Sequence, residues 1–149
     1  MAGQVCYERE HKESTPMIKT VQIQTGVRTE FIDITGKVQD VVRESKAREG
    51  ICYLFVPHTT AAITINENAD PSVHQDIVME LNKVVPFDDQ YRHIEGNSAA
   101  HIKASIIGFS ETVFIESGTL LLGTWQGIYF CEFDGPRQRR LHVKVTASH

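Results

Sequence analysis

The chain has 149 residues, of which 41% are hydrophobic and 23% charged, the length and composition of a single globular domain that buries its own core. Its net charge of −4 and pI near 5.9 exclude the overall basic field that recruits nucleic acid or an anionic membrane. No stretch reaches the roughly 20 apolar residues of a membrane span; the lack of an apolar signal segment and the odd number of cysteines predict a cytoplasmic protein.

The first elements in chain order are a polar leader, a hairpin and a helix. Residues 1–17 follow neither the helical nor the strand period and are expected to form a mobile leader, which leaves residues 18–149 as one domain. Alternating apolar residues on both sides of Gly26 predict a β-hairpin. Thr35 is a suitable cap for a helix that continues to about Arg48.

Two strands and a second helix follow. The run GICYLFVP (50–57) is typical of a buried strand, and AAITI (61–65) resumes as another after the polar HTT. Asp70-Pro71 is a strong helix start, because aspartate accepts a hydrogen bond from a free backbone N–H and proline suits the first helical position. This helix is predicted to run to about Val85. Its buried stripe is predicted to consist of Val73, Ile77, Leu81 and Val84.

The rest of the chain is a loop, a short helix and dense β-structure. A polar loop over 86–96 leads to a helix that Asn97 caps and Gly108 ends. Four apolar runs follow, with tight turns at Ser117-Gly118 and at DGPR (134–137), and they are typical of antiparallel strands. The whole pattern predicts an α+β fold, with antiparallel strands and two or three helices on one face.

Three histidines occupy positions typical of metal ligands. His58 follows a buried strand, His93 lies in the polar loop, and His101 is early in the third helix. Imidazoles at such places can direct their nitrogens to one point, and two or three of them with a water form an open, catalytic type of metal site. The alternative is a chance grouping, because the chain has seven histidines and no HxH or HExxH spacing.

Carboxylates and amides gather before the second helix. Asn66, Glu67 and Asp70 approach a helix N-terminus, where the dipole and the free N–H groups favour anions. A helix-capping role alone is enough to explain an aspartate at position 70. The sequence suggests no structural role for Glu67, which makes it the stronger functional candidate.

Cationic and aromatic candidates lie in the last third of the chain. Arg137 and Arg139 occupy alternate positions of DGPRQRR, where guanidinium groups either hold phosphate on one face or protect a solvated edge strand. Trp125 lies between two glycines that allow a close backbone approach. It either stacks on a flat ring or closes a core.

Three long motifs, HTTAAITINENADP, RHIEGNSAAHIKASIIG and LGTWQGIYFCEFDGPRQRR, resemble the YjbQ family, small proteins described as secondary thiamine-phosphate synthases. The resemblance covers about residues 18–146. It implies an α+β domain with a β-sandwich-like core, assembled as a homotrimer with sites near the subunit boundaries. The implied activity is weak thiamine-phosphate synthesis: a pyrimidinylmethyl diphosphate loses pyrophosphate, and the nitrogen of a thiazole phosphate captures the methylene. The TIM barrel of the familiar synthases does not fit into 149 residues.

Mapped onto this chain, the resemblance gives a hypothesis for each site residue. A divalent ion, zinc or magnesium, would be held by His58, His93 and His101. The catalytic candidates are His58, Glu67, Asp70 and His101. The candidates that bind a small phosphorylated metabolite are Asn66, Asn97, Lys103, Trp125, Arg137 and Arg139. Two other functions stay open: a metal-dependent hydrolase of a small phosphate ester, and a non-catalytic trimeric metabolite-binding protein.

Overall fold

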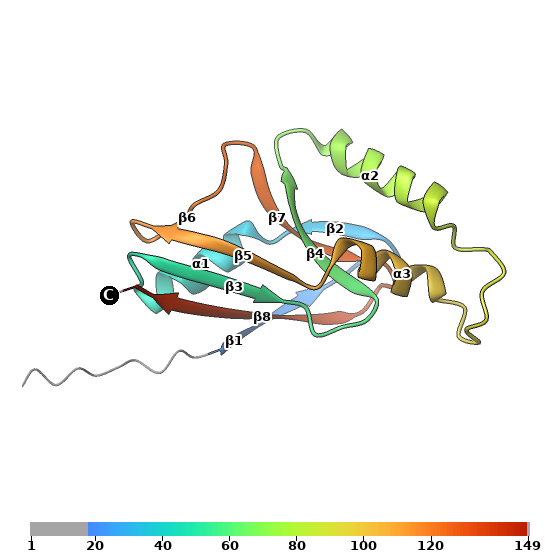
Figure 1. Cartoon of the computed structure of the whole chain (residues 1–149), viewed down its shortest axis with the longest axis horizontal. Coiled ribbons are helices and arrows are strands. Elements are labelled where there is room, and N and C mark those ends of the chain that lie inside the picture. The colour runs from blue at the N-terminus through green and yellow to red at the C-terminus, as the bar shows by residue number, and fades with distance from the viewer. Residues whose placement is uncertain (1–17, 149) are drawn as a thin grey trace, which may run out of the picture.

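The computed structural model describes residues 18–148 (Figure 1), so the predicted leader over residues 1–17 lies outside the described residues. Within that range the chain forms eight strands and three helices. In chain order they are β1 (Ile18–Gln24), β2 (Glu30–Asp33), α1 (Thr35–Ser45), β3 (Gly50–Phe55), β4 (Ala61–Glu67), α2 (Pro71–Val84), α3 (Ser98–Ile107), β5 (Ser110–Glu116), β6 (Thr119–Leu120), β7 (Gln126–Glu132) and β8 (Gln138–Ala147). The predicted α+β class is confirmed.

The strands form two antiparallel sheets. A five-stranded sheet has the order β1-β8-β3-β5-β6, and a three-stranded sheet has the order β2-β7-β4. The hairpin predicted around Gly26 is therefore wrong, because its two strands, β1 and β2, belong to different sheets. Between them lies the main core, to which α1 contributes Val38, Val41 and Val42. This packing buries the alternate apolar residues of both sheets, as the period-two pattern requires.

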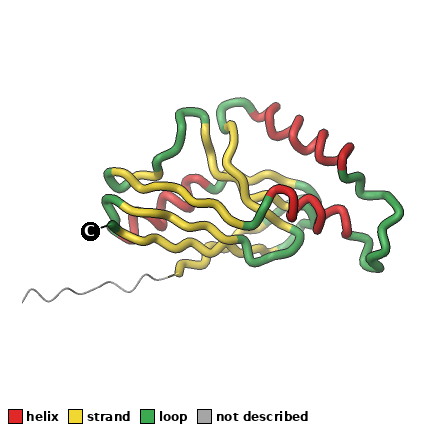
Figure 2. The backbone as a smooth tube through the Cα atoms, in the orientation of Figure 1, coloured by secondary structure: helices red, strands yellow, loops and turns green. Residues whose placement is uncertain are grey.

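The helices do not share one face. α1 packs inside the main core, whereas α3 and part of α2 cover the outer face of the three-stranded sheet over a second, smaller cluster (Figures 1 and 2). The buried members of that cluster are Ala62, Ala100, Ala104, Tyr129, Cys131 and Phe133. None of the described helices has the length and apolar character needed to cross a membrane.

Helix α2 begins where the sequence predicts but does not bury the predicted stripe. Oδ1 of Asp70 accepts a hydrogen bond from the backbone N–H of Ser72 at 2.9 Å, and Pro71 is the first helical residue. No residue of α2 is buried, however, and Val84 is 72% exposed. The helix extends away from the sheets (Figure 1), so its apolar face is only partly covered within one chain.

The capping prediction for Asp70 is confirmed, whereas those for Thr35 and Asn97 need correction. Thr35 is the first residue of α1 rather than its cap, and its hydroxyl accepts a hydrogen bond from Ile128 N–H in β7. The helix ends at Ser45, because Lys46 adopts a left-handed conformation with φ of 59°. Asn97 occupies the N-cap position of α3, but its side chain makes no capping hydrogen bond.

A buried ion pair joins the two sheets. The guanidinium of Arg139 in β8 donates from Nε and Nη2 to the carboxylate of Glu132 in β7, at 2.8 and 2.6 Å. Nη2 also donates to the hydroxyl of Thr60, and the hydroxyl of Thr25 donates to Glu132. Burial opposes ionisation of Glu132, but these hydrogen bonds and the charge of Arg139 outweigh it and lower its pKa. The pair is therefore charged, and both carboxylate oxygens of Glu132 are hydrogen-bonded.

Replacement of Arg139 by methionine is expected to lower the free energy of unfolding by about 3–5 kcal/mol, because it leaves the Glu132 carboxylate buried without a counter-charge. Chemical denaturation measures the loss. The double variant Arg139→Met, Glu132→Leu should recover most of it. Arg43→Met is the matched control: it removes an exposed ion pair with Asp40 and should change stability by less than about 1 kcal/mol. Equal losses in the two single variants would contradict the assignment.

Candidate functional site

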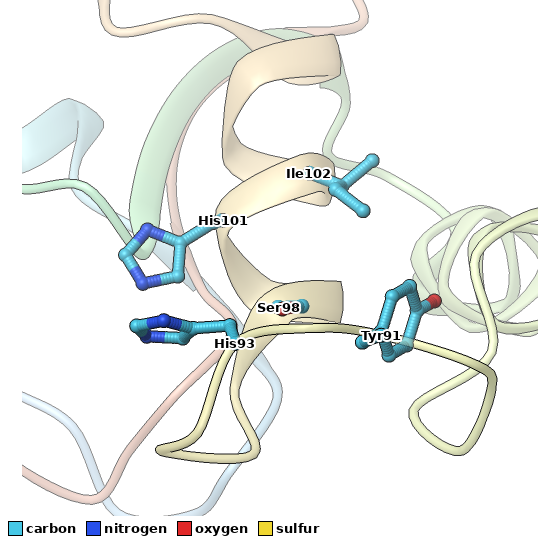
Figure 3. Close-up of a pocket in the computed structure, with 5 residues that line it drawn as sticks. All are labelled: Tyr91, His93, Ser98, His101 and Ile102. Carbon is cyan, nitrogen blue, oxygen red and sulfur yellow. The ribbon is translucent and has the colours of Figure 1, made fainter.

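A pocket of about 310 Å³ opens beside the N-terminal half of α3 (Figure 3). The connection between α2 and α3 supplies two of its residues, Tyr91 and His93. The first two turns of α3 supply the other three, Ser98, His101 and Ile102. In Figure 3 both imidazoles extend to one side of the helix, and Tyr91 lies on the other side. The pocket therefore depends on how the 86–96 loop lies against α3.

The two imidazoles in this pocket are close neighbours. Their ring centroids are 5.5 Å apart with an interplanar angle of 89°, and Nε2 of His93 is 3.7 Å from a carboxylate oxygen of Glu95. Two imidazoles from different elements can supply two ligands of an open site, of the type that binds zinc more readily than magnesium. Among residues 18–148 no three or more His, Cys, Asp or Glu side chains are grouped closely enough to hold a metal ion.

The N-terminus of α3 forms one wall of the pocket. Nδ2 of Asn97 donates to Oδ2 of Asp134 at 2.9 Å instead of capping the helix. The side chain of Asn97 therefore does not cap the first N–H groups of α3. Ser98, the first residue of the helix, lines the pocket. Uncapped N–H groups and the positive end of the helix dipole favour an anionic ligand.

His58 lies apart from the other two candidate ligands. Its Nε2 accepts a hydrogen bond from the backbone N–H of Arg140 at 2.8 Å, and that nitrogen cannot bind a metal while it holds this bond. Burial and the positive charges of Arg139 and Arg140 lower its pKa, which keeps the ring neutral as an acceptor. Within a single chain, His58 therefore does not complete a three-histidine cluster with His93 and His101.

The acidic candidates lie at the opposite end of β4 from His58. The strand has seven residues, about 20 Å at roughly 3.3 Å per residue; His58 precedes its first residue and Glu67 is its last. Asp70 caps α2, and the carboxylate of Glu67 accepts a hydrogen bond from Ala69 N–H at 3.2 Å. The side chain of Asn66 accepts from the next N–H at 2.7 Å. These are local turn contacts.

Trp125 lies near this acidic end and is not part of a core. Its side chain is 63% exposed, and its carbonyl accepts a hydrogen bond from Asn68 N–H at 2.9 Å. A Cβ at Gly127 would lie 2.9 Å from Cβ of Asn68, so glycine permits this close approach, as the sequence predicts. The exposed indole remains available to a flat ring.

The three cationic candidates differ in exposure. Arg137 is exposed and binds Asp134 through its carbonyl, at 2.8 Å, and its carboxylate, at 3.0 Å. Arg139 is only 4% exposed and its guanidinium is occupied by Glu132. Lys103 is fully buried. Only Arg137 of the three is thus presented to a ligand in this structure. The burial of the other two does not follow from their residue type, so the sequence did not predict it.

Sequence reasoning did not single out Tyr91, Ser98 or Ile102, which also line the pocket. Ser98 directly follows the predicted cap Asn97, and this position was a usable signal, since the first residue of a helix lies next to its free N–H groups. The loop that carries Tyr91 has no periodicity from which its direction follows.

The sequence is similar to a family of known proteins over almost all of the described residues. The sequence profile of the family described as UPF0047 protein YjbQ-like matches residues 19–148. The chain belongs to this family. A UPF0047 protein of Methanocaldococcus jannaschii is 53% identical over 129 residues, which cover 87% of this chain and 94% of that protein. The UPF0047 protein YugU of Bacillus subtilis is 52% identical over 130 residues, 87% of this chain and 98% of that protein.

Solved structures of UPF0047 proteins share the fold. The crystal structure of a YjbQ/UPF0047 family protein from Clostridium acetobutylicum is 54% identical and superposes with a TM-score of 0.84, covering 86% of this chain and 99% of that one. A YbjQ-like protein of unknown function from Sulfolobus solfataricus is 31% identical, with a TM-score of 0.85 over 90% of this chain and 99% of that one. The family match over residues 19–148 includes every residue that lines the pocket.

The lowered pKa of His58 predicts a pH dependence of stability. Because the unfolded chain binds this proton more tightly than the folded chain, the contribution of His58 is complete above pH 6.5 and is lost as pH falls toward the folded pKa. Between pH 7 and pH 5, the wild type should lose more unfolding free energy than His58→Gln, measured by denaturation at each pH. A His58→Gln curve parallel to the wild type would contradict the prediction.

Proposed function

We propose that this UPF0047 protein is a small-molecule transferase of the thiamine-phosphate synthase type, which joins a pyrimidinylmethyl diphosphate to a thiazole phosphate with the help of a divalent ion, zinc or magnesium. The observation that carries the proposal is the pair His93 and His101 beside the uncapped N-terminus of α3. This combination offers metal ligands and an anion-binding helix end in one pocket, which diphosphate chemistry requires.

The chemistry assigns a task to each part of the pocket. The C–O bond between the methylene and the diphosphate breaks, pyrophosphate leaves with the electron pair, and the thiazole nitrogen forms the new C–N bond. Negative charge builds on the leaving oxygens, and a bound divalent ion would supply charge against it. His93 and His101 would hold that ion, and the first N–H groups of α3 would hold a phosphate. The exposed guanidinium of Arg137, which pairs with Asp134, would be a further phosphate ligand.

A homotrimer is part of this proposal. The acidic residues Glu67 and Asp70 do not line the pocket that holds the imidazole pair, and no residue of α2 is buried within the chain. Contact between copies would cover α2 and allow the acidic end of one copy, with Trp125, to approach the histidines of another. Apolar surface that a single chain leaves exposed commonly marks such a contact.

A metal-dependent hydrolase of a small phosphate ester is the second candidate. The openness of the pocket favours it, because His93 is 44% exposed and water reaches the pair. Hydrolysis would use the same ligands with water as acceptor in place of the thiazole nitrogen. The two functions differ in product: a coupled thiamine phosphate or free inorganic phosphate.

The test is a product assay with purified full chain, the pyrimidinylmethyl diphosphate, the thiazole phosphate and added zinc or magnesium. We expect thiamine phosphate to form and kcat/KM to fall at least about 100-fold in His101→Ala and in His93→Ala, since each removes a metal ligand. Chelation should reduce activity and re-addition of metal should restore it. His142→Ala, on the outer face of the five-stranded sheet, is the matched control.

Three results would contradict the proposal. Full activity in His101→Ala would remove the histidine pair from the mechanism. Release of inorganic phosphate from generic esters without coupling would favour the hydrolase. Tight binding of a phosphorylated metabolite without turnover in either assay would favour the non-catalytic binding protein.

A further inference from the structure

The pocket beside α3 has two chemically different sides. In Figure 3 His93 and His101 extend to one side of the helix, whereas Tyr91 lies on the other side, to which Ile102 also points. The histidine side offers ring nitrogens as ligands. Among the described residues that line the opposite side, Tyr91 and Ile102 present an aromatic ring and an aliphatic chain. The proposed function assigns the metal and the phosphates to the histidine side and the helix end, and leaves the apolar side without a ligand.

The helix itself separates the two sides. Successive residues of an α-helix diverge by about 100° around its axis, so His101 and Ile102 project from α3 in different directions. Ser98 precedes them by three and four positions, a spacing at which side chains on a helix are roughly 5–6 Å apart. A small ligand at the N-terminus of α3 therefore reaches both sides through a short link between its parts.

Tyr91 is held so that its ring, rather than its hydroxyl, faces the pocket. The hydroxyl donates a hydrogen bond to the carbonyl of Pro86, and the backbone N–H of Tyr91 donates to the carbonyl of Asp89 at 2.8 Å. In Figure 3 the phenol oxygen lies at the end of the ring that points away from Ser98. Both bonds form within the 86–96 loop, so the ring is oriented before a ligand arrives. A fixed aromatic face loses little entropy when it binds a flat ring.

Ile102 supplies the aliphatic part of the same side. It is 39% exposed, because α3 turns a different face toward the protein interior. That buried face consists of Ala99, Ala100, Lys103 and Ala104. Contact with an apolar ligand removes the surface of Ile102 from water, which is favourable. Small-molecule pockets combine apolar walls of this kind with a few polar groups that fix the orientation of the ligand.

The size of the pocket limits what it holds. Its volume of about 310 Å³ is at the lower end of the roughly 300–1,000 Å³ typical of small-molecule sites. One small ring with its phosphates matches this space, whereas a second ring-bearing substrate needs space outside it. In the proposed reaction a single methylene links the ring of one substrate to its diphosphate. The ring and the diphosphate therefore have to occupy adjacent parts of one site.

We propose that Tyr91 and Ile102 form a ring-binding subsite, which holds the flat ring of a heteroarylmethyl diphosphate while the histidine side and the N-terminus of α3 hold its phosphates. The inference rests on the proposed function for the identity of the ligand. The subsite itself stands on the positions of Tyr91, Ile102 and Ser98 in the pocket. Tyr91 and Ile102 are then specificity-determining residues, which select a diphosphate with a flat ring over pyrophosphate and over phosphate esters without a ring.

The test compares two ligands that share the diphosphate. Titration calorimetry with the full chain, at one fixed concentration of zinc, gives the dissociation constants of the pyrimidinylmethyl diphosphate and of inorganic pyrophosphate. The readout is the ratio of the two constants, because damage to the fold or to the metal site weakens both ligands alike. We expect the wild type to bind the ring-bearing ligand about tenfold or more tightly, since stacking of a base on an aromatic side chain has an effect of this size.

Two substitutions should reduce this preference with little change for pyrophosphate. Tyr91→Ala deletes the aromatic face and should lower the ratio by about tenfold, and Ile102→Ala should lower it by about threefold. Tyr91→Phe keeps the ring and loses only the hydrogen bond to Pro86, so it should keep the ratio. Ile106→Ala is the matched control, because Ile106 is 57% exposed one turn later in α3 and does not line the pocket.

An unchanged ratio in Tyr91→Ala overturns the proposal, and so does equal affinity of the wild type for the two ligands. Equal losses in Tyr91→Phe and Tyr91→Ala also overturn it, because the effect then belongs to the hydroxyl and the shape of the loop. None of these readings depends on turnover. A ring preference that Tyr91→Ala abolishes, in a protein that forms no thiamine phosphate, contradicts the proposed function alone. Formation of thiamine phosphate with a ratio that Tyr91→Ala leaves unchanged contradicts the subsite alone.

Discussion

The buried ion pair between Glu132 and Arg139 is the contact on which the arrangement of the pocket depends. It joins the two sheets, and it also orders the turn that follows β7, because Glu132 accepts the backbone N–H groups of Phe133 and Asp134 at 3.0 and 2.9 Å. Asp134 in turn holds the side chain of Asn97 at the start of α3. A hydrogen-bonded path thus leads from the core to the helix end that lines the pocket, and the buried charge pair at its origin keeps that path in one geometry.

Most of the fold follows from local pattern. Alternation and capping residues place the strands and helices close to their observed bounds, because those signals act over neighbouring residues. Relations between distant segments do not follow from such patterns. The apolar period of α2 marks the face that needs cover, but it does not say whether the same chain provides it. The differences at Thr35 and Asn97 have a similar origin, since both side chains bond to β7 or to the turn after it instead of to their own helix.

The candidate site was only partly predictable. His93 and His101 share a pocket because the loop before α3 folds back along it, whereas His58 and Glu67 border the same strand at opposite ends. Closeness in a motif therefore did not mean closeness in space. Residue type was also a poor guide to which cations reach a ligand. Arginine is normally a surface residue, and the buried position of Arg139 follows only from its partner Glu132 on another strand. Such pairings become visible once the strand order is known.

The pairing of β1 with β8 has a consequence for how the chain reaches this structure. Ile18 lies opposite Lys144, so the first and last strands of the domain are neighbours in one sheet. During synthesis β1 has no partner until β8, the last strand of the domain, has been made, and their pairing closes a loop that contains all the other strands. Contacts of such long range slow folding and leave strand edges exposed meanwhile. A nascent chain that stops before β8 would leave the edges of both β1 and β3 unpaired and open to pairing with other chains.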